Sequence, residues 1–157
     1  MMKTPVTEFL DSHNILYNLK LHSQPVFTCE DAARERNVRL SQILKCMVGQ
    51  DAEVNLYVML IPGDKTLKIK RARQLAGGIR IELVAPEQLA EQLGLTVGAI
   101  SPIQLLGKAK QCFMDHSVFR EEWVAMSAGV PEAGVEVQAE SLAELLGVVR
   151  GDIISVR

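Results

Sequence analysis

Apolar and polar residues along this chain form short blocks with two different periods. Residues 54–61 are nearly all apolar, which predicts a strand that is covered on both faces. The Pro-Gly-Asp triplet at 62–64 predicts the turn that ends this strand. Shorter apolar or alternating runs predict seven further strands, at residues 16–21, 43–48, 79–84, 110–114, 123–127, 135–138 and 153–156.

Capping residues mark the starts of the predicted helices. Thr4 followed by Pro5 suits a helix start. Thr28, with Asp31 three residues further on, predicts a second helix that fades near Asn37. Further helices are predicted at residues 68–76, 86–94, 116–122 and 141–146, the last one capped by Ser141.

The order of these elements predicts an α+β fold. Strands and helices interleave, but several neighbouring strands have no helix between them. This order favours one mixed, partly antiparallel sheet with flanking helices over a doubly wound parallel sheet. No repeat, linker or low-complexity tract divides residues 1–157, so we expect a single domain.

Composition narrows the class of protein. The 157 residues are 48% hydrophobic and 23% charged, as in an ordinary globular protein. The formal net charge of −2 means that nucleic-acid binding would need a local basic patch. Three scattered cysteines without a Cys-x-x-Cys pair argue against a zinc site and favour a reducing compartment. No signal peptide or membrane-spanning run is seen, so we expect a cytoplasmic protein with no membrane partner.

One lysine interrupts the apolar strand at residues 43–48. On a strand, Lys45 shares a face with Ile43 and Met47. One interpretation is an edge-strand lysine, whose stem lies on apolar surface while its ammonium stays in water. The alternative is a cation that lines a pocket, where it binds an anion or polarises a carbonyl group.

A loop rich in glycine and proline, residues 94–102, follows the helix at 86–94. It is either a helix C-cap glycine followed by an ordinary turn, or a ligand-binding loop. In the second interpretation Gly98 allows the backbone to approach a ligand closely, and Pro102 stiffens the exit. Two parallel amides there would form an oxyanion hole.

A basic cluster lies between these two features. Most charge runs are solvated faces, but clustering in a chain of net negative charge leaves room for contacts with a phosphate backbone. The candidate residues are Lys65, Lys68, Lys70, Arg71 and Arg73.

The remaining polar residues suggest no nucleophile. No Ser-His-Asp or Cys-His arrangement follows from the spacing. Cys46 points to the opposite strand face from Lys45 and is expected in the core. Asp115 is expected to cap the helix at residues 116–122, with the orientation of a site group or water as the alternative.

Four segments, in this order, resemble the YbaK/prolyl-tRNA synthetase editing-domain family of free-standing aminoacyl-tRNA deacylases. Residues 28–33 look like its early helix, and residues 43–48 look like its strand with the site lysine. Residues 94–102 look like its Gly-x-x-x-Pro loop, and Met114–Asp115 with Gly129 look like its later strand and glycine. One departure is that His22 and Pro25 are not adjacent, so His22 is assigned no role.

The resemblance implies hydrolysis of the ester between a wrong amino acid and the 3′ end of a tRNA, with mischarged tRNA(Pro) or a related small-amino-acid mischarging as the expected substrate. It implies a single sheet curled into a pseudo-barrel, with no metal and no cofactor. The resemblance also implies that the substrate's own ribose hydroxyl assists, in place of a general base. Expected partners are tRNA and an aminoacyl-tRNA synthetase. A non-catalytic module that binds tRNA or a synthetase, and a small-molecule esterase or nucleotide binder, remain alternatives.

The residues that would carry this chemistry fall into two groups. The expected catalytic group combines the Lys45 ammonium with loop amides that hold the oxyanion, namely those of Gly98, Ala99, Ile100 and Ser101, with Pro102 closing the loop. The expected amino-acid pocket is lined by Leu44, Met47, Val58, Asp115 and Gly129, together with Ile100.

Overall fold

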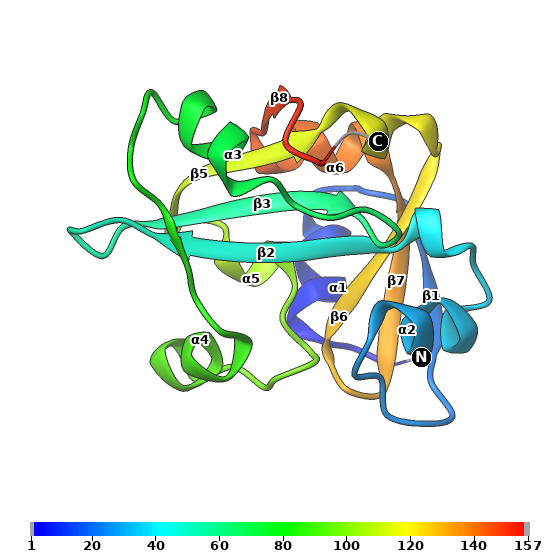
Figure 1. The fold of residues 1–157 in the computed structure, drawn as a ribbon. Helices are drawn as coiled ribbons and strands as arrows, with labels where there is room; N and C mark the ends of the chain where they lie inside the picture. Colours follow the sequence, from blue (N-terminus) through cyan, green and yellow to red (C-terminus); the bar gives the residue numbers. More distant parts are fainter. Residues whose placement is uncertain (1, 156–157) are drawn as a thin grey trace.

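A computed structural model describes residues 2–155 of the chain. Helices and strands interleave along it, as Figure 1 shows. The helices are α1 Pro5–Ser12, α2 Cys29–Arg36, α3 Ile69–Leu75, α4 Pro86–Leu93, α5 Pro102–Leu105 and α6 Ala139–Leu146, with 3₁₀ helices η1 Leu40–Gln42 and η2 His116–Arg120. The strands are β1 Tyr17–Leu21, β2 Leu44–Gln50, β3 Leu56–Pro62, β4 Glu82–Leu83, β5 Ala109–Asp115, β6 Trp123–Val130, β7 Ala133–Gln138 and β8 Val149–Gly151.

The strands form two sheets. One has the order β4-β2-β3-β5-β8 and the other the order β1-β7-β6. Strand β5 pairs in parallel with β3 and β8, whereas the remaining pairs are antiparallel, so the mixed α+β class is confirmed. No membrane-length apolar helix occurs among residues 2–155.

The predicted single sheet is wrong, and the described strands do not close into a barrel. Strand β8 occupies the outer edge of β5. The β6–β7 hairpin therefore cannot extend that sheet beyond β5, and it pairs with β1 instead. The two sheets meet at one isolated parallel bridge, Ile43 to Ala125.

Local capping explains where the first helices begin. The Thr4 side chain accepts a hydrogen bond from the Thr7 amide, and Thr7 returns one to the Thr4 amide. Thr28 caps α2 by accepting from the Asp31 amide at 3.0 Å. Both predicted caps are confirmed, because these signals depend only on residues three apart.

Two predictions near the C-terminus are wrong. Helix α6 begins at Ala139 rather than at Ser141, and the Ala139 amide, which has no partner inside the helix, donates to the Glu122 carbonyl at 2.9 Å. The last strand is β8, not residues 153–156. Ile153 donates its amide to the Asp115 carboxylate at 2.7 Å, and Ile154 makes only an isolated bridge to Leu67. Val156 lies outside the described residues.

Strand β3 is buried along its whole length, as predicted. Val58 and Leu60 pack into one core cluster, whereas Tyr57, Met59 and Ile61 pack into another on the opposite face. Burial on both faces fixes β3 firmly, and β2 runs antiparallel to it over seven residue pairs. The outer edge of β2 thereby becomes a well-defined wall on which a site can be built.

Candidate functional site

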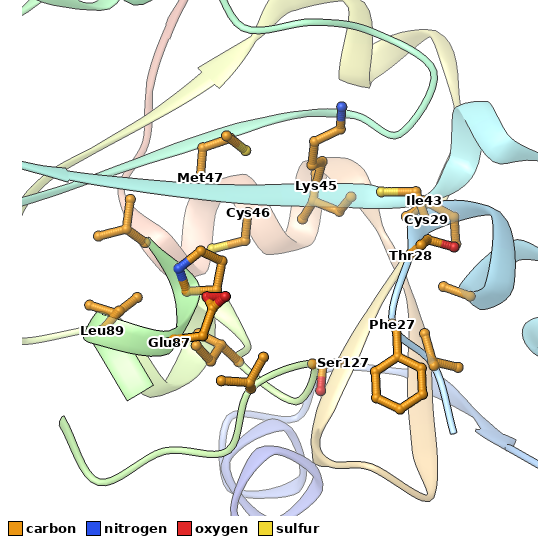
Figure 2. A pocket seen from close by; sticks show the side chains of 18 of the residues that line it. Phe27, Thr28, Cys29, Ile43, Lys45, Cys46, Met47, Glu87, Leu89 and Ser127 are labelled. Carbon is orange, nitrogen blue, oxygen red and sulfur yellow. The ribbon is translucent and has the colours of Figure 1, made fainter. Parts of the chain in front are cut away.

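A cavity of about 390 Å³ lies along the outer edge of β2. It is bounded by the segment that leads into α2, by α4, by the 94–102 loop and by Ser127 of β6 (Figure 2). Its volume is typical of small-molecule sites. The lining residues are Val26, Phe27, Thr28, Cys29, Ala32, Arg36, Ile43, Leu44, Lys45, Cys46, Met47, Val48, Val84, Pro86, Glu87, Leu89, Val97, Gly98, Ile100 and Ser127.

The cavity exists because β2 is only partly paired on this side. Its partner there is β4, which pairs only with Gly49 and Gln50. The Val48 carbonyl accepts from the Val84 amide at 2.9 Å, so the backbone of Val48 points to this edge. Since strand backbone groups alternate in direction, the N–H and C=O of Cys46 also point to this edge. The cavity wall thus carries backbone donors and acceptors as well as apolar side chains.

Lys45 is half-buried at the border of this cavity. Its ammonium donates a 2.6 Å hydrogen bond to the Lys65 carbonyl. Figure 2 shows the amine on the opposite side of β2 from the side chains of Cys46 and Glu87. An ammonium has three donors, so two remain after the bond to Lys65. Lys45 and Gly98, which lie far apart in the sequence, border the same cavity.

The 94–102 loop has four amides without an acceptor among the described residues, those of Thr96, Val97, Gly98 and Ile100, and only the last two belong to the group expected to hold the oxyanion. Ala99 donates to the Thr96 carbonyl at 3.0 Å, and Ser101 donates to Gln104 Oε1 at 2.9 Å. Pro102 has no N–H. The amides of Gly98 and Ile100 have no acceptor among residues 2–155, and both residues line the cavity.

Gly98 is the point of close approach within this loop. Its φ of +82° lies in the left-handed region, which a residue with a side chain rarely adopts. A Cβ at this position would lie 2.9 Å from the Val26 carbonyl oxygen. Glycine is therefore needed both for the backbone turn and for the contact with the opposite wall.

Some predicted pocket residues line this cavity and others do not. Leu44, Met47 and Ile100 do. Val58 lies instead in the core next to β5. Gly129 lies near the end of β6 with a φ of +86°, where the pairing with β7 shifts register, and a Cβ there would lie 3.0 Å from Val6 Cγ2.

Asp115 also lies away from the cavity. Its carboxylate caps η2 by accepting from the amide and hydroxyl of Ser117, which confirms the predicted cap. The other oxygen accepts from the Ile153 amide at 2.7 Å. Asp115 therefore ties η2 to the C-terminal segment, because both carboxylate oxygens are used there.

The basic cluster divides into free and engaged cations. Lys68 and Lys70 are exposed. Arg73 donates to the Ile81 carbonyl at 2.9 Å, and Arg71 donates to the Ile154 carbonyl at 3.3 Å. Lys65 lies 3.9 Å from the Asp64 carboxylate and accepts the bond from Lys45 through its carbonyl. The cluster is thus connected to the cavity through the backbone of Lys65.

The thiols are poor nucleophiles. Burial raises the pKa of Cys29, which lines the cavity, above its usual value. Burial likewise raises the pKa of Cys46, and it raises the pKa of Cys112 to about 12. All three are therefore protonated at neutral pH, whereas the thiolate is the attacking form. Among residues 2–155, no group of His, Cys, Asp and Glu side chains is arranged to hold a metal ion.

Two charged residues that line the cavity were not predicted from the sequence. Glu87 lies in the first turn of α4, and Figure 2 shows its carboxylate directed between α4 and β2. Arg36, at the end of α2, is only 4% exposed and donates from Nε to His22 Nε2 at 3.2 Å. The sequence contains no signal for either residue, because long-range packing brings both to the cavity.

Comparison with known proteins identifies the family. The aminoacyl-tRNA editing domain family matches residues 23–145. The chain is 37% identical over 98 residues to the proline–tRNA ligase of Maridesulfovibrio salexigens, a stretch that covers 62% of this chain and 16% of the ligase. It is 24% identical over 148 residues to the prolyl-tRNA editing protein ProX of Acetoanaerobium sticklandii, which covers 92% of this chain and 90% of ProX.

A solved structure shares the fold. The crystal structure of the hypothetical protein APE2540 superposes with a TM-score of 0.86 at 27% identity, over 96% of this chain and 99% of that one. The matched family region contains Lys45, Glu87 and the 94–102 loop, and it makes up more than half of the sequence. This chain belongs to the aminoacyl-tRNA editing domain family.

Proposed function

We propose that the chain is a trans-editing deacylase that hydrolyses the ester bond of mischarged aminoacyl-tRNA. The observation that carries this proposal is that Lys45 borders the same cavity as Gly98 and Ile100, whose amides have no acceptor among the described residues. The family match and the relative named as a prolyl-tRNA editing protein support it. In this proposal residues 1–157 act as one editing domain in the cytoplasm, with mischarged tRNA(Pro) or a related small-amino-acid mischarging as substrate.

The free amides of Gly98 and Ile100 hold the oxyanion that forms when the ester carbonyl is attacked. Backbone donors fixed in place before the reaction stabilise that charge without reorganisation. Four amides were expected to hold the oxyanion. Those of Ala99 and Ser101 already donate to Thr96 and Gln104, so Gly98 and Ile100 remain as the proposed donors. The two remaining Lys45 donors bind a substrate phosphate oxygen on their own side of β2, the side opposite Glu87.

Glu87 binds the α-ammonium group of the substrate. It is the one carboxylate in the described cavity wall, and the α-ammonium is the cation next to the ester. The amino-acid side chain then rests against the apolar part of the wall, which includes Leu44, Val84 and Leu89. Such a surface separates side chains that differ by one methylene by only about 1–3 kcal/mol.

Water attacks the carbonyl directly. The raised pKa of the Cys29 thiol makes a covalent intermediate unfavourable, and no other nucleophile–base pair borders the cavity. An aminoacyl ester is already activated, so stabilisation of the oxyanion supplies much of the required acceleration. The vicinal hydroxyl of the terminal ribose assists the attacking water.

The tRNA reaches the cavity across two surfaces. Phe27, which is 77% exposed at the cavity mouth, offers a face on which a terminal base stacks. Lys68 and Lys70 contact the phosphate backbone, with Lys65, Arg71 and Arg73 beside them. A synthetase that charges the same tRNA is a further proposed partner.

A deacylation screen tests the proposal. Each tRNA, correctly charged and mischarged, is incubated with the wild-type chain, and release of the amino acid is measured beside binding. We expect turnover of at least one mischarged tRNA. Binding without turnover across the whole panel would instead identify a non-catalytic module. Hydrolysis of model esters with indifference to tRNA would indicate a small-molecule esterase.

A further inference from the structure

Arg36 is a buried cation without a counter-charge. It is 4% exposed, and its single side-chain hydrogen bond goes from Nε to His22 Nε2 at 3.2 Å. No carboxylate among residues 2–155 lies within 4.0 Å of its guanidinium. Burying an ionised group without a partner is strongly unfavourable. The burial lowers the pKa of Arg36 to about 10, so it remains charged at neutral pH.

The fold makes room for this side chain. A Cβ on Gly134 of β7 would lie 2.8 Å from Arg36 Cδ and from Arg36 Cζ, so the guanidinium fits only over a glycine. His22 Nδ1 lies 2.9 Å from the Pro131 carbonyl, which requires the proton on Nδ1. His22 Nε2 is therefore an acceptor for Arg36. These contacts position the guanidinium but supply no negative charge.

The two terminal nitrogens of Arg36 are free to bind a ligand. Within residues 2–155, Gln50 Oε1 is the one fully buried side-chain N or O atom without a hydrogen-bond partner. The two terminal nitrogens of Arg36 have no partner and must therefore keep some contact with solvent. Arg36 is among the residues that line the cavity, and we infer that the terminal nitrogens reach solvent there.

A second cation borders the same cavity. Lys45 and Arg36 both line it, and the charge of each lowers the pKa of Cys29 against the larger effect of burial. Glu87 projects from α4, on the other wall. The cavity border therefore carries a cation on β2, a cation on α2 and a carboxylate on α4.

We propose that Arg36 binds the phosphate group of the substrate's 3′-terminal nucleotide. This inference rests on the proposed function. In an aminoacyl-tRNA the group next to the ester is a cationic amine, and the nearest anion is the phosphate 5′ to the esterified ribose. A guanidinium fork matches phosphate oxygens in a bidentate arrangement. Phosphate binding also explains why the fold holds a guanidinium in the wall without a carboxylate.

The test compares two minimal substrates that differ only in this phosphate. One is 3′-aminoacyl-adenosine, and the other is the same compound with a 5′-phosphate. We expect wild-type kcat/KM to be about 10- to 100-fold higher for the phosphorylated compound. Arg36→Gln should remove this difference and leave hydrolysis of the unphosphorylated compound within about twofold of wild type. Arg34→Gln, on the same helix but exposed, should keep the full difference.

Equal losses on both substrates, or a phosphate preference that survives in Arg36→Gln, would overturn the inference. A measurement on the wild-type chain avoids reliance on the folding of that variant. Adenosine 5′-monophosphate should shift the Arg36 side-chain NMR signals at concentrations where adenosine does not. Absence of that shift also overturns the inference. If wild type hydrolyses no aminoacyl-tRNA but the shift occurs, the proposed function fails and the phosphate site stands.

Discussion

The Lys45 ammonium donates a 2.6 Å hydrogen bond to the Lys65 carbonyl. This bond joins the cavity border on β2 to the first residue of the basic cluster. The next cations along the chain, Lys68 and Lys70, are exposed at the start of α3. Under the proposed function, we expect a tRNA phosphate backbone that follows these lysines to run towards Lys45 at the cavity border.

Charge reversal at Lys68 and Lys70 should weaken tRNA binding without affecting the chemical step. We expect the double variant Lys68→Glu/Lys70→Glu to raise KM for aminoacyl-tRNA, and the slope of log K against log[salt] to fall by about 1–2. Hydrolysis of 3′-aminoacyl-adenosine should be unchanged, because that compound does not extend to α3. The control is the charge reversal Lys3→Glu next to α1, where Lys3 pairs with Asp11. An unchanged salt slope in the double variant would contradict the proposed path.

Gly98→Ala should remove activity beyond its effect on stability. A left-handed residue with a side chain costs about 1–2 kcal/mol, which lowers Tm by about 2–8 °C for a chain of this size. The new Cβ would also lie 2.9 Å from the Val26 carbonyl and so displace the loop amides. We expect deacylation to fall about 100-fold.

Gly94→Ala is the matched control for this substitution. Gly94 has a φ of +69°, and a Cβ there would meet nothing within 4 Å. It should therefore show a similar fall in Tm with nearly unchanged kcat. Equal activity in the two variants would mean that the position of Gly98 in the loop is unimportant for catalysis.

Glu87→Gln should raise KM for aminoacyl-tRNA about tenfold, because it replaces a charge-assisted hydrogen bond by a neutral one. The same substitution should have no effect on N-acetyl-aminoacyl-tRNA, which lacks the ammonium group. Glu91→Gln, also on α4 but away from the cavity wall, serves as the control. Steady-state kinetics on both substrates distinguish recognition of the ammonium from a general loss of structure.

His22 should make stability fall in mild acid. Burial and the Arg36 charge lower the pKa of His22 below 6.5, against the Pro131 hydrogen bond and the charges of Glu35 and Glu132. The unfolded chain therefore takes up this proton at a higher pH than the folded chain. The contribution of neutral His22 is complete above pH 6.5 and is lost as the pH falls through the folded pKa.

Thermal unfolding between pH 7.5 and 5 measures this effect. Wild-type Tm should fall over that range, and His22→Asn should reduce the fall, since asparagine cannot be protonated there. His13→Asn, which alters an exposed histidine at the end of α1, should leave the fall unchanged. The same pH dependence in wild type and His22→Asn would rule out His22 as its source.

The sequence predicts what depends on neighbouring residues. The caps Thr4, Thr28 and Asp115 are correct because each acts within three residues of its own position. The two-sheet arrangement was missed because it depends on which edges are free, such as that of β5 beside β8. No local pattern encodes that choice.

Local sequence patterns also predict some of the site residues and miss others. Lys45 is predicted because it is a cation in an apolar strand, and Gly98 because it is a glycine in a loop. In the sequence, Arg36 resembles any charged residue near a helix end. Its burial follows only from its packing over Gly134 in the folded chain. Val58, Asp115 and Gly129 were expected in the pocket, but Val58 packs in the core, Asp115 caps η2 and Gly129 lies at a register shift in β6.

The most direct test of the account is the single-turnover rate of deacylation for Lys45→Ala and Lys45→Met. Both remove the ammonium, and methionine keeps an apolar stem. We predict a fall of about 100-fold in each variant, with Tm within about 5 °C of wild type, while Lys68→Ala keeps the wild-type single-turnover rate. Wild-type deacylation rates in two folded Lys45 variants would contradict the central claim.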